Sequence, residues 1–267
     1  MYEKIASIVL RAGKLIKDAE HIEKSVKEKT SACDLVTEYD TAVQEQLRAE
    51  LMAEYPQFGF YGEENDCCQT DGKIGWFIVD PIDGTANFVR GLHHSCISVG
   101  LLVDGQMEYG VVYNPYYDEL FTAQRGKGAY LNGERIHVTD VDMDNSLLLF
   151  GSAIYYRDTI PATLRFVEEL FPRVLDFRRG GSAALDLCYL AAGRADVYFE
   201  CCIRPWDYAA GSLIVQEAGG IVSALDGTEL RFVDRCSVAA GNSKNYQELI
   251  ALSAKIAAEP DMKGRIK

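Results

Sequence analysis

The sequence predicts a mixed α/β fold, and three observations lead to this prediction. Apolar residues recur at helical spacing near residues 3–24 and again in the segment after Thr37. The rest of the first half carries consecutive apolar β segments, two of which are joined by the hairpin turn Asp104-Gly105. The second half alternates β segments with helical segments, which is typical of helices packed on a sheet. Apolar residues make up 48% of the chain, which is ample for a sizeable core.

The first half begins with two predicted helices. The apolar face of the first, near 3–24, comprises Ile5, Ile8, Val9, Ala12, Leu15, Ile16, Ala19 and Ile22. The second helix begins after Thr37 and stops at Pro56, and its inward positions are Val43, Leu47, Leu51 and Tyr55. The β segments of this half are expected near 58–61, 76–80, 95–103, 107–114 and 118–123, followed by a short strand and turn near 128–138.

The second half is predicted to continue the same domain with a different order of elements. Its strands are expected near 146–152, 174–178, 195–199, 221–224 and 236–240. Its helices are expected near 158–170, 182–192, 206–218 and 243–257. A length of 267 residues suits one large domain, here residues 1–267, with a soft boundary near 140–145 between the subdomains 1–142 and 143–267.

Charge and cysteine content exclude several classes of function. The formal net charge is −13, so direct binding of nucleic acid or of an anionic membrane surface is not expected, because both need Lys and Arg. None of the eight cysteines forms a Cys-x-x-Cys pair or a Cys/His cluster with zinc spacing. The N-terminus has no signal-peptide pattern, and uncharged apolar runs are too short to span a bilayer. We therefore expect a reduced, cytoplasmic protein.

Residues 76–85 are the most informative part of the chain. They end an apolar strand in two carboxylates, Asp80 and Asp83, and continue at once into Gly84. Carboxylate oxygens are the ligands that Mg²⁺ prefers, and the backbone amides that follow the turn can hold a phosphate. In the structural alternative, the two acids are turn formers beside Pro81. The apolar strand favours the metal site, because such a strand lies inside a sheet and ends at a site.

Two other catalytic arrangements are disfavoured. Haloacid-dehalogenase-like phosphatases use Asp-x-Asp with one intervening residue, whereas two residues separate Asp80 from Asp83, so a covalent aspartyl mechanism is not expected. His93 and His94 are adjacent, so they cannot point the same way on a strand, and no Ser or Cys nucleophile motif accompanies them. We expect these histidines to be structural, surface or substrate-lining residues.

Further acids lie near the ends of other predicted elements. Glu63 follows a short strand, where it is either a solvated loop charge or a metal ligand. Asp40 lies three residues after Thr37, which resembles a capping box, and a capping role is compatible with a role in a site. Asp207 lies early in a helix, and Glu200 lies seven residues before it at the end of a strand. These two acids can converge on one crevice, the usual ligand position in open α/β sheets.

Together these elements resemble the inositol monophosphatase family over nearly the whole chain. The resemblance rests on Asp34-Leu-Val-Thr-Glu-Tyr-Asp40, Gly62-Glu-Glu64, Trp76 through Phe88, Gly181-Ser-Ala-Ala184, and Trp206-Asp207 followed by Glu217-Ala-Gly-Gly220. Taken alone, the segment from Gly181 is either a plain helix N-terminus or a backbone that a ligand can approach closely. Ala86 stands where a second Thr is common, which should spare the metals but alter packing under the turn. The Asn87-Phe88 pair favours the inositol branch over nucleotide-directed relatives.

The resemblance implies a layered α-β-α-β-α sandwich of the sugar-phosphatase type, within the α/β (α+β) class. It also implies a lithium-sensitive homodimer that uses two or three Mg²⁺ ions. The implied metal ligands are Glu63, Asp80, the carbonyl of Ile82, Asp83 and Asp207. The implied substrate-binding residues are Asp83, Gly84, Thr85, Gly181, Ser182, Ala183, Glu200 and Asp207. The implied catalytic residues, which align water or deliver a proton, are Glu63, Asp40, Thr85 and Asp207.

The expected function is hydrolysis of myo-inositol 1-phosphate, or of a related phosphorylated polyol or sugar, by a metal-activated water. Such chemistry consists mainly of positioning and charge neutralisation. Two enzymatic alternatives are a fructose-1,6-bisphosphatase and a 3′-phosphoadenosine-5′-phosphate phosphatase. A third alternative is a non-catalytic regulatory relative, since some bacterial members of the family are implicated in functions linked to RNA polymerase.

Overall fold

The computed structural model describes residues 1–22, 26–28, 35–64 and 72–266. The first half contains helices α1 (Tyr2–Lys17), α2 (Glu38–Glu54) and α3 (Thr85–Val89). Its strands are β1 (Lys27–Glu28), β2 (Leu35–Val36), β3 (Gly59–Gly62), β4 (Gly75–Asp83), β5 (Cys96–Val103), β6 (Gln106–Asn114), β7 (Glu119–Gln124), β8 (Gly128–Leu131) and β9 (Glu134–Ile136).

The second half contains helices α4 (Ile160–Leu170), α5 (Ala183–Ala191), α6 (Pro205–Glu217) and α7 (Ser243–Ala257). Its strands are β10 (Leu147–Phe150), β11 (Asp176–Arg178), β12 (Val197–Ile203), β13 (Ile221–Ser223) and β14 (Cys236–Gly241). Short 3₁₀ turns are η2 (Met143–Asn145), η3 (Phe171–Arg173) and η4 (Pro260–Met262). The predicted alternation of helices and strands in this half is confirmed.

The first predicted helix is shorter than expected, because α1 ends at Lys17 rather than near residue 24. Acidic residues follow it directly, and negative charge at a helix C-terminus opposes the helix dipole. His21 then takes a positive φ of 53°, which is incompatible with a continuing helix. Ala19 and Ile22 still pack against the core, so their apolar character reflects burial outside a helix.

The predicted start of the second helix is confirmed as a capping box. The Thr37 hydroxyl oxygen accepts from the backbone amides of Tyr39 and Asp40, and the Asp40 carboxylate accepts from the Thr37 amide at 2.8 Å. The helix ends at Glu54, just before Pro56, as expected. Asp34, the first residue of the motif that contains this cap, lies outside the described residues, as do Cys33, Cys67 and Cys68.

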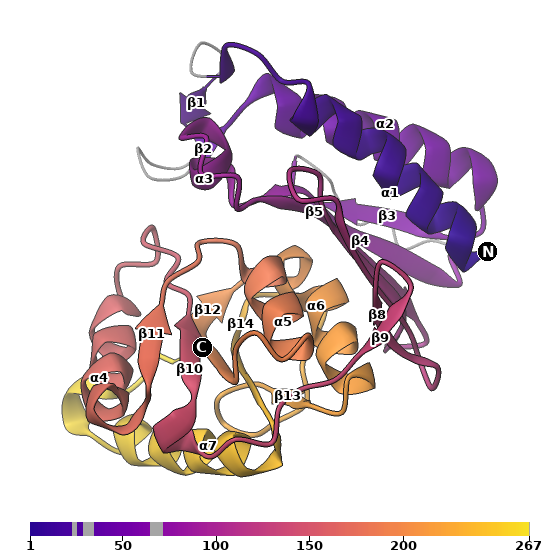
Figure 1. The fold of residues 1–267 in the computed structure, drawn as a ribbon. Coiled ribbons are helices and arrows are strands. Elements are labelled where there is room, and N and C mark those ends of the chain that lie inside the picture. The colour runs from indigo at the N-terminus through magenta and orange to yellow at the C-terminus, as the bar shows by residue number, and fades with distance from the viewer. Residues whose placement is uncertain (23–25, 29–34, 65–71, 267) are drawn as a thin grey trace.

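Two large sheets carry the fold (Figure 1). The first has the order β3-β4-β5-β6-β7-β8-β9, in which β3 and β4 are parallel and the other neighbours antiparallel. The second has the order β11-β10-β12-β14-β13. The predicted Asp104-Gly105 hairpin turn is present, with positive φ at both residues. Near 128–138 the structure has two strands, because Asn132-Gly133 makes the same kind of turn.

The elements stack in five layers, as predicted for an α-β-α-β-α sandwich. Helices α1 and α2 cover one face of the first sheet, and α5 and α6 lie between the two sheets (Figure 1). Helices α4 and α7 cover the outer face of the second sheet. Small residues permit the central packing, because a Cβ on Gly110 of β6 would lie 2.7 Å from the carbonyl oxygen of Ala210 in α6.

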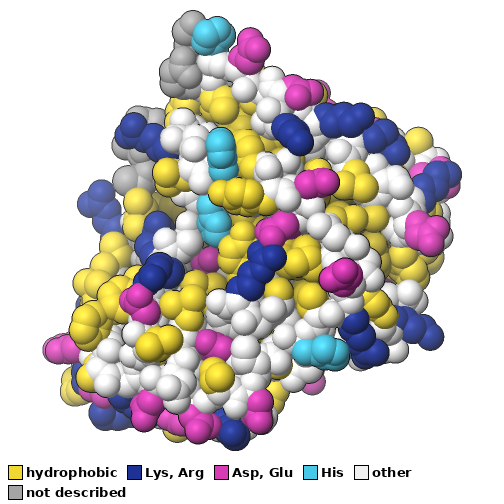
Figure 2. Space-filling model, viewed as in Figure 1, with side chains coloured by type: hydrophobic (Ala, Val, Ile, Leu, Met, Phe, Trp, Pro, Cys, Tyr) yellow, Lys and Arg dark blue, Asp and Glu magenta, His cyan; other side chains and the backbone are white. Residues whose placement is uncertain are grey.

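One central core cluster combines residues from both halves, including Ile78 and Cys96 of the first sheet and Leu149 and Tyr198 of the second. The division into two subdomains therefore stays a prediction. On the face shown in Figure 2, basic and acidic side chains are interspersed over the surface. In the described part of the chain, every helix is too short or too polar to cross a membrane.

Candidate active site

A cleft of about 220 Å³ lies where the end of β4, helix α3, the N-terminus of α5, strand β12 and the start of α6 meet. Six carboxylates line it, contributed by Glu63, Asp80, Asp83, Asp186, Glu200 and Asp207. Residues 151–155 line a further side. The cleft therefore brings together acids from five separate segments of the chain.

A β-bulge explains how Asp80 and Asp83 reach the same site. On a regular strand, residues three apart point to opposite faces. Here Asp80 pairs with Ser98 and Asp83 with Cys96, so three steps along β4 match two along β5. The extra residue turns both carboxylates to one side. The Ile82 amide donates to Asp80 Oδ1 at 3.0 Å and fixes this geometry.

Three carboxylates form a group that could hold a metal ion. Single oxygens of Asp80, Asp83 and Asp207 all lie within 4.8 Å of one another. Asp207 stands in the first turn of α6, where its Oδ2 accepts from the Arg204 amide at 2.8 Å. Glu63 lines the same cleft but lies outside this close group. Clustered hard oxygens on a partly open cleft suit Mg²⁺, which keeps several waters.

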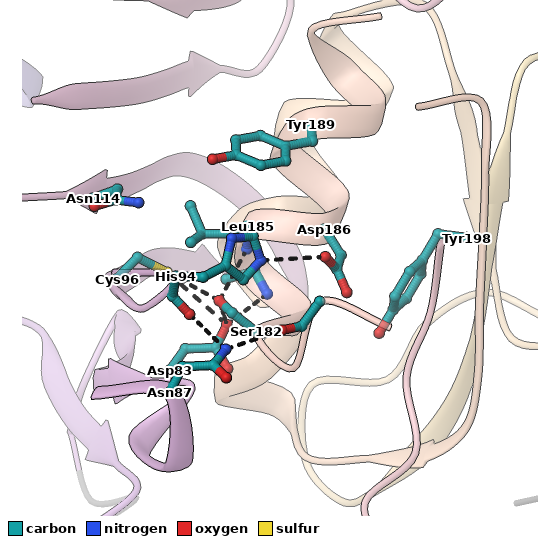
Figure 3. Close-up of polar contacts among 12 residues, drawn as sticks. Asp83, Asn87, His94, Cys96, Asn114, Ser182, Leu185, Asp186, Tyr189 and Tyr198 are labelled. Carbon is teal, nitrogen blue, oxygen red and sulfur yellow. Dashed lines mark hydrogen bonds and ion pairs between the residues drawn. The ribbon is translucent and has the colours of Figure 1, made fainter. Parts of the chain in front are cut away.

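Residues of the second half of the chain donate hydrogen bonds directly to Asp83. Asp83 Oδ2 accepts from the Ser182 hydroxyl at 2.6 Å and from the Ala184 amide at 2.7 Å, both at the start of α5 (Figure 3). The Cys96 thiol lies 3.9 Å from the same oxygen. Asp83 therefore joins the first sheet to the central helices as well as facing the other acids.

The crowded acids have unusual titration behaviour. Burial, together with the charges of Asp186 and Glu63, raises the pKa of Asp83 to about 7, although the hydrogen bonds from Ser182 and Ala184 act in the opposite direction. Burial also raises the pKa of Asp207 well above its ordinary value, and the charges of Asp83 and Glu63 add to the rise. Such mutual repulsion is relieved when a divalent cation lies between the carboxylates, so the donor set fits Mg²⁺.

The turn after β4 requires glycine. Gly84 has a φ of +88°, and a Cβ there would lie 3.0 Å from the carbonyl oxygen of His94. Thr85, the next residue, begins α3. Its hydroxyl lies 3.2 Å from Asp40 Oδ1 and 3.1 Å from the Ile82 carbonyl oxygen. The predicted pair of Thr85 and Asp40 is thus brought together beside the carboxylate group.

The predicted alcohol side also lines the cleft, with one correction. Glu200 was expected at the end of a strand, but β12 continues to Ile203, so Glu200 lies within it beside an irregularity in the pairing. The Tyr198 hydroxyl donates to Glu200 Oε2 at 2.8 Å, and burial raises the pKa of Glu200 to about 8. Ser182 is committed to Asp83, and Gly181 and Ala183 expose backbone to the cleft.

Sequence reasoning missed several residues of the cleft. Asp186 is 1% exposed on α5, and its Oδ1 lies 3.6 Å from Nε2 of His94, one of the two histidines left open as structural (Figure 3). Asn87, which the sequence indicates only as part of a family motif, lies outside the cleft lining and donates to the carbonyls of His94 and Gly180, at 2.7 and 2.9 Å. Asp186 could have been noticed in the sequence, because it is the one acidic residue in an otherwise apolar helical segment. Tyr155 also lines the cleft, but it lies in a loop whose sequence has no motif that indicates a site.

Comparisons with known proteins agree with this geometry. The sequence profile of the inositol monophosphatase family matches residues 1–258. The Nus factor SuhB of Escherichia coli K12 is 39% identical over 244 residues, which cover 90% of this chain and 91% of that protein.

Two solved structures share the fold. The extragenic suppressor protein suhB from Bartonella henselae is 34% identical, with a TM-score of 0.87 over 95% of this chain and 98% of that one. The inositol monophosphatase from Anabaena (Nostoc) sp. PCC 7120 is 31% identical, with a TM-score of 0.84 over 95% of each chain. By its sequence over 258 residues and by its fold, the chain belongs to the inositol monophosphatase family.

Proposed function

We propose that this protein is a Mg²⁺-dependent phosphomonoesterase. Its substrate would be myo-inositol 1-phosphate or a related polyol or sugar phosphate, and its products the alcohol and inorganic phosphate. The observation that carries this proposal is the meeting of three carboxylates and the Gly84 turn in one cleft. The name of the Anabaena relative, an inositol monophosphatase, supports the same substrate class.

Asp80, Asp83, Asp207, Glu63 and the Ile82 carbonyl would hold the ions, of which we propose two or three. When bound, Mg²⁺ neutralises phosphate charge and lowers the pKa of water at the site. Oxygens of Asp80 and Asp207 lie within 4.8 Å of an oxygen of Asp83, which is held at Oδ2 by Ser182. That bond fixes the orientation of the Asp83 carboxylate beside the other two acids.

The chain's own residues would position the nucleophile. The Asp40 carboxylate accepts from Thr37 at Oδ2, which leaves Oδ1 to face the Thr85 hydroxyl. Thr85 and Asp40, together with Glu63, would orient the attacking water. The amides of Gly84 and Thr85 would hold the phosphate oxygens, because the first amides of a helix lack helical partners.

The other side of the cleft would bind the alcohol part of the substrate through its hydroxyl groups. Glu200 is fixed by Tyr198, and its second oxygen can form a hydrogen bond with a substrate hydroxyl. The backbone at Gly181 and Ala183 offers further polar groups without bulky side chains. Asp207 would lie near the leaving oxygen and pass a proton to it through water.

Phosphate release from myo-inositol 1-phosphate, measured with Mg²⁺ and with EDTA, tests the proposal. Wild-type protein should release phosphate only with Mg²⁺, and Asp83→Asn should lower kcat by a factor of about 10³ or more, as loss of a charge-stabilising group does. Retained turnover in the variant would contradict the site. A panel that adds fructose 1,6-bisphosphate and 3′-phosphoadenosine 5′-phosphate distinguishes the two enzymatic alternatives.

The name of the Escherichia coli relative, a Nus factor, favours a second candidate, a regulatory role linked to RNA polymerase. Binding to purified polymerase by wild type and by Asp83→Asn separates the two roles. Equal binding by both proteins would show that a regulatory role does not depend on the catalytic carboxylates. Lithium sensitivity and a homodimer stay predictions that follow from the family.

A further inference from the structure

The charges that line the cleft are unequal in number. Among the described residues that line it, six are carboxylates and one, Arg179, is a cation. Metal ions at Asp80, Asp83 and Asp207 would offset the negative charge of the carboxylates nearest the Gly84 turn. Arg179 lies in the segment after β11, outside that group. A positive charge fixed in this place points to a further negative group on the ligand.

Arg179 is held in place at the mouth of the cleft. Its Nη2 donates to the carbonyl oxygen of Ser152 at 3.0 Å, which ties it to the loop 151–155 on another side of the cleft. A Cβ built on Gly181 would lie 3.6 Å from Arg179 Nη1, and a Cβ on Gly84 would lie 3.1 Å from the Gly181 carbonyl oxygen. The Gly181 backbone therefore lies between the Arg179 guanidinium and the Gly84 turn.

Among the described residues, no close carboxylate neutralises the charge of Arg179. Its neighbour Arg178 pairs with Asp176 at 2.6 Å, whereas no described carboxylate lies within ion-pair distance of Arg179. Its charge acts over a longer range, since it offsets part of the rise in pKa that burial causes in Glu200 and Asp186. Arg179 is exposed to solvent, so a ligand in the cleft can reach its remaining N–H groups.

We propose that Arg179 binds a second anionic group of the substrate. The preferred substrates would then be phosphate monoesters of a sugar or polyol that also carry another phosphate or a carboxylate. A guanidinium binds either group through paired hydrogen bonds. The inference rests on the proposed phosphatase function, and it specifies the substrate class of that same site. The ester phosphate itself would lie at the Gly84 turn, on the other side of the Gly181 backbone from Arg179.

Three esters that differ only at carbon 6 test the proposal. These are glucose 1-phosphate, glucose 1,6-bisphosphate and glucuronic acid 1-phosphate, assayed for phosphate release with Mg²⁺. In wild-type protein, kcat/KM should be higher for one or both doubly anionic esters. Arg179→Gln should lower these values by about tenfold or more, as expected for loss of a charge-assisted hydrogen bond, and should change glucose 1-phosphate less than twofold. The two doubly anionic arms show whether phosphate or carboxylate is preferred.

Arg178→Gln is the matched control, because it removes the same charge one residue away from the cleft lining, and it should leave all three values unchanged. An equal loss for all three esters in Arg179→Gln would overturn the proposal, since Arg179 would then hold the ester phosphate or the loop. Unchanged values would overturn it as well. If wild-type protein releases no phosphate, the proposed function fails, and calorimetric binding of the three esters decides the inference by the same comparison.

Discussion

Replacement of Asp83 by asparagine should stabilise the metal-free protein while removing its response to Mg²⁺. The hydrogen bonds that Asp83 receives from Ser182 and Ala184 end on a single oxygen, Oδ2, which the Cys96 thiol also faces, so an amide oxygen can accept them in the same place. The amide nitrogen would then occupy the position of Oδ1. The substitution places a neutral amide donor, rather than a like charge, beside the carboxylates of Asp80 and Asp207.

The magnitude follows from the pKa of Asp83. Burial raises it from 3.8 to about 7, so the folded protein binds the proton more tightly than the unfolded chain. This contribution to stability is complete below pH 3.8 and is lost as the pH rises through 7, because the slope of stability with pH is negative wherever the folded state holds more protons. The loss amounts to about 4 kcal/mol, of which roughly 2–3 kcal/mol falls between pH 5 and 8.

Urea unfolding in EDTA at pH 5 and pH 8 measures this effect. The free energy of unfolding of Asp83→Asn minus that of wild type should grow by roughly 2–3 kcal/mol between these pH values. Addition of Mg²⁺ should stabilise wild type by about 2.7 kcal/mol at a hundredfold excess over Kd, and the variant much less. A variant that is less stable than wild type at pH 8 in EDTA, with a difference independent of pH, would refute the reasoning.

Three further substitutions have expected outcomes. Burial raises the pKa of Glu200 to about 8, so this carboxyl contributes stability that is lost as the pH rises from about 4.5 through 8. Glu200→Gln should therefore make the pH dependence of urea unfolding shallower, while the part due to Asp83 stays, and should raise KM. Gly84→Ala places a Cβ 3.0 Å from the His94 carbonyl oxygen at a positive φ. It should lower the free energy of unfolding by about 1–3 kcal/mol and remove most turnover. The control Gly105→Ala, where the Cβ meets open space, should keep full turnover. Asn87→Ala removes the donor to the carbonyls of His94 and Gly180 and should lower the free energy of unfolding in urea by about 2 kcal/mol. An unchanged free energy would contradict this structural role.

Local signals account for the parts of the fold that the sequence predicted well. The capping box at Thr37 and Asp40 and the hairpin turn at Asp104-Gly105 each depend on a few neighbouring residues. The end of α1 was wrong because apolar spacing continues through Ile22, which packs against the core without being helical. Burial and helical periodicity look the same in a sequence whenever an irregular segment happens to keep the spacing.

The candidate site was predictable where motifs carry it and hidden where tertiary packing does. Asp80 and Asp83 stand out by sequence, yet their convergence depends on a bulge paired against β5. The bond from Ser182 to Asp83 joins residues 99 positions apart, which no local pattern reveals. Arg179 gave no sequence signal, because its significance comes from the loop 151–155 that it contacts.

Anomalous diffraction from crystals soaked in Mn²⁺ tests the central claim most directly, because Mn²⁺ accepts the same hard oxygen ligands as Mg²⁺. The account predicts at least one anomalous peak coordinated together by oxygens of Asp80, Asp83 and Asp207. A map with peaks only elsewhere on the protein, or with none, at an ion concentration that supports phosphate release would contradict it.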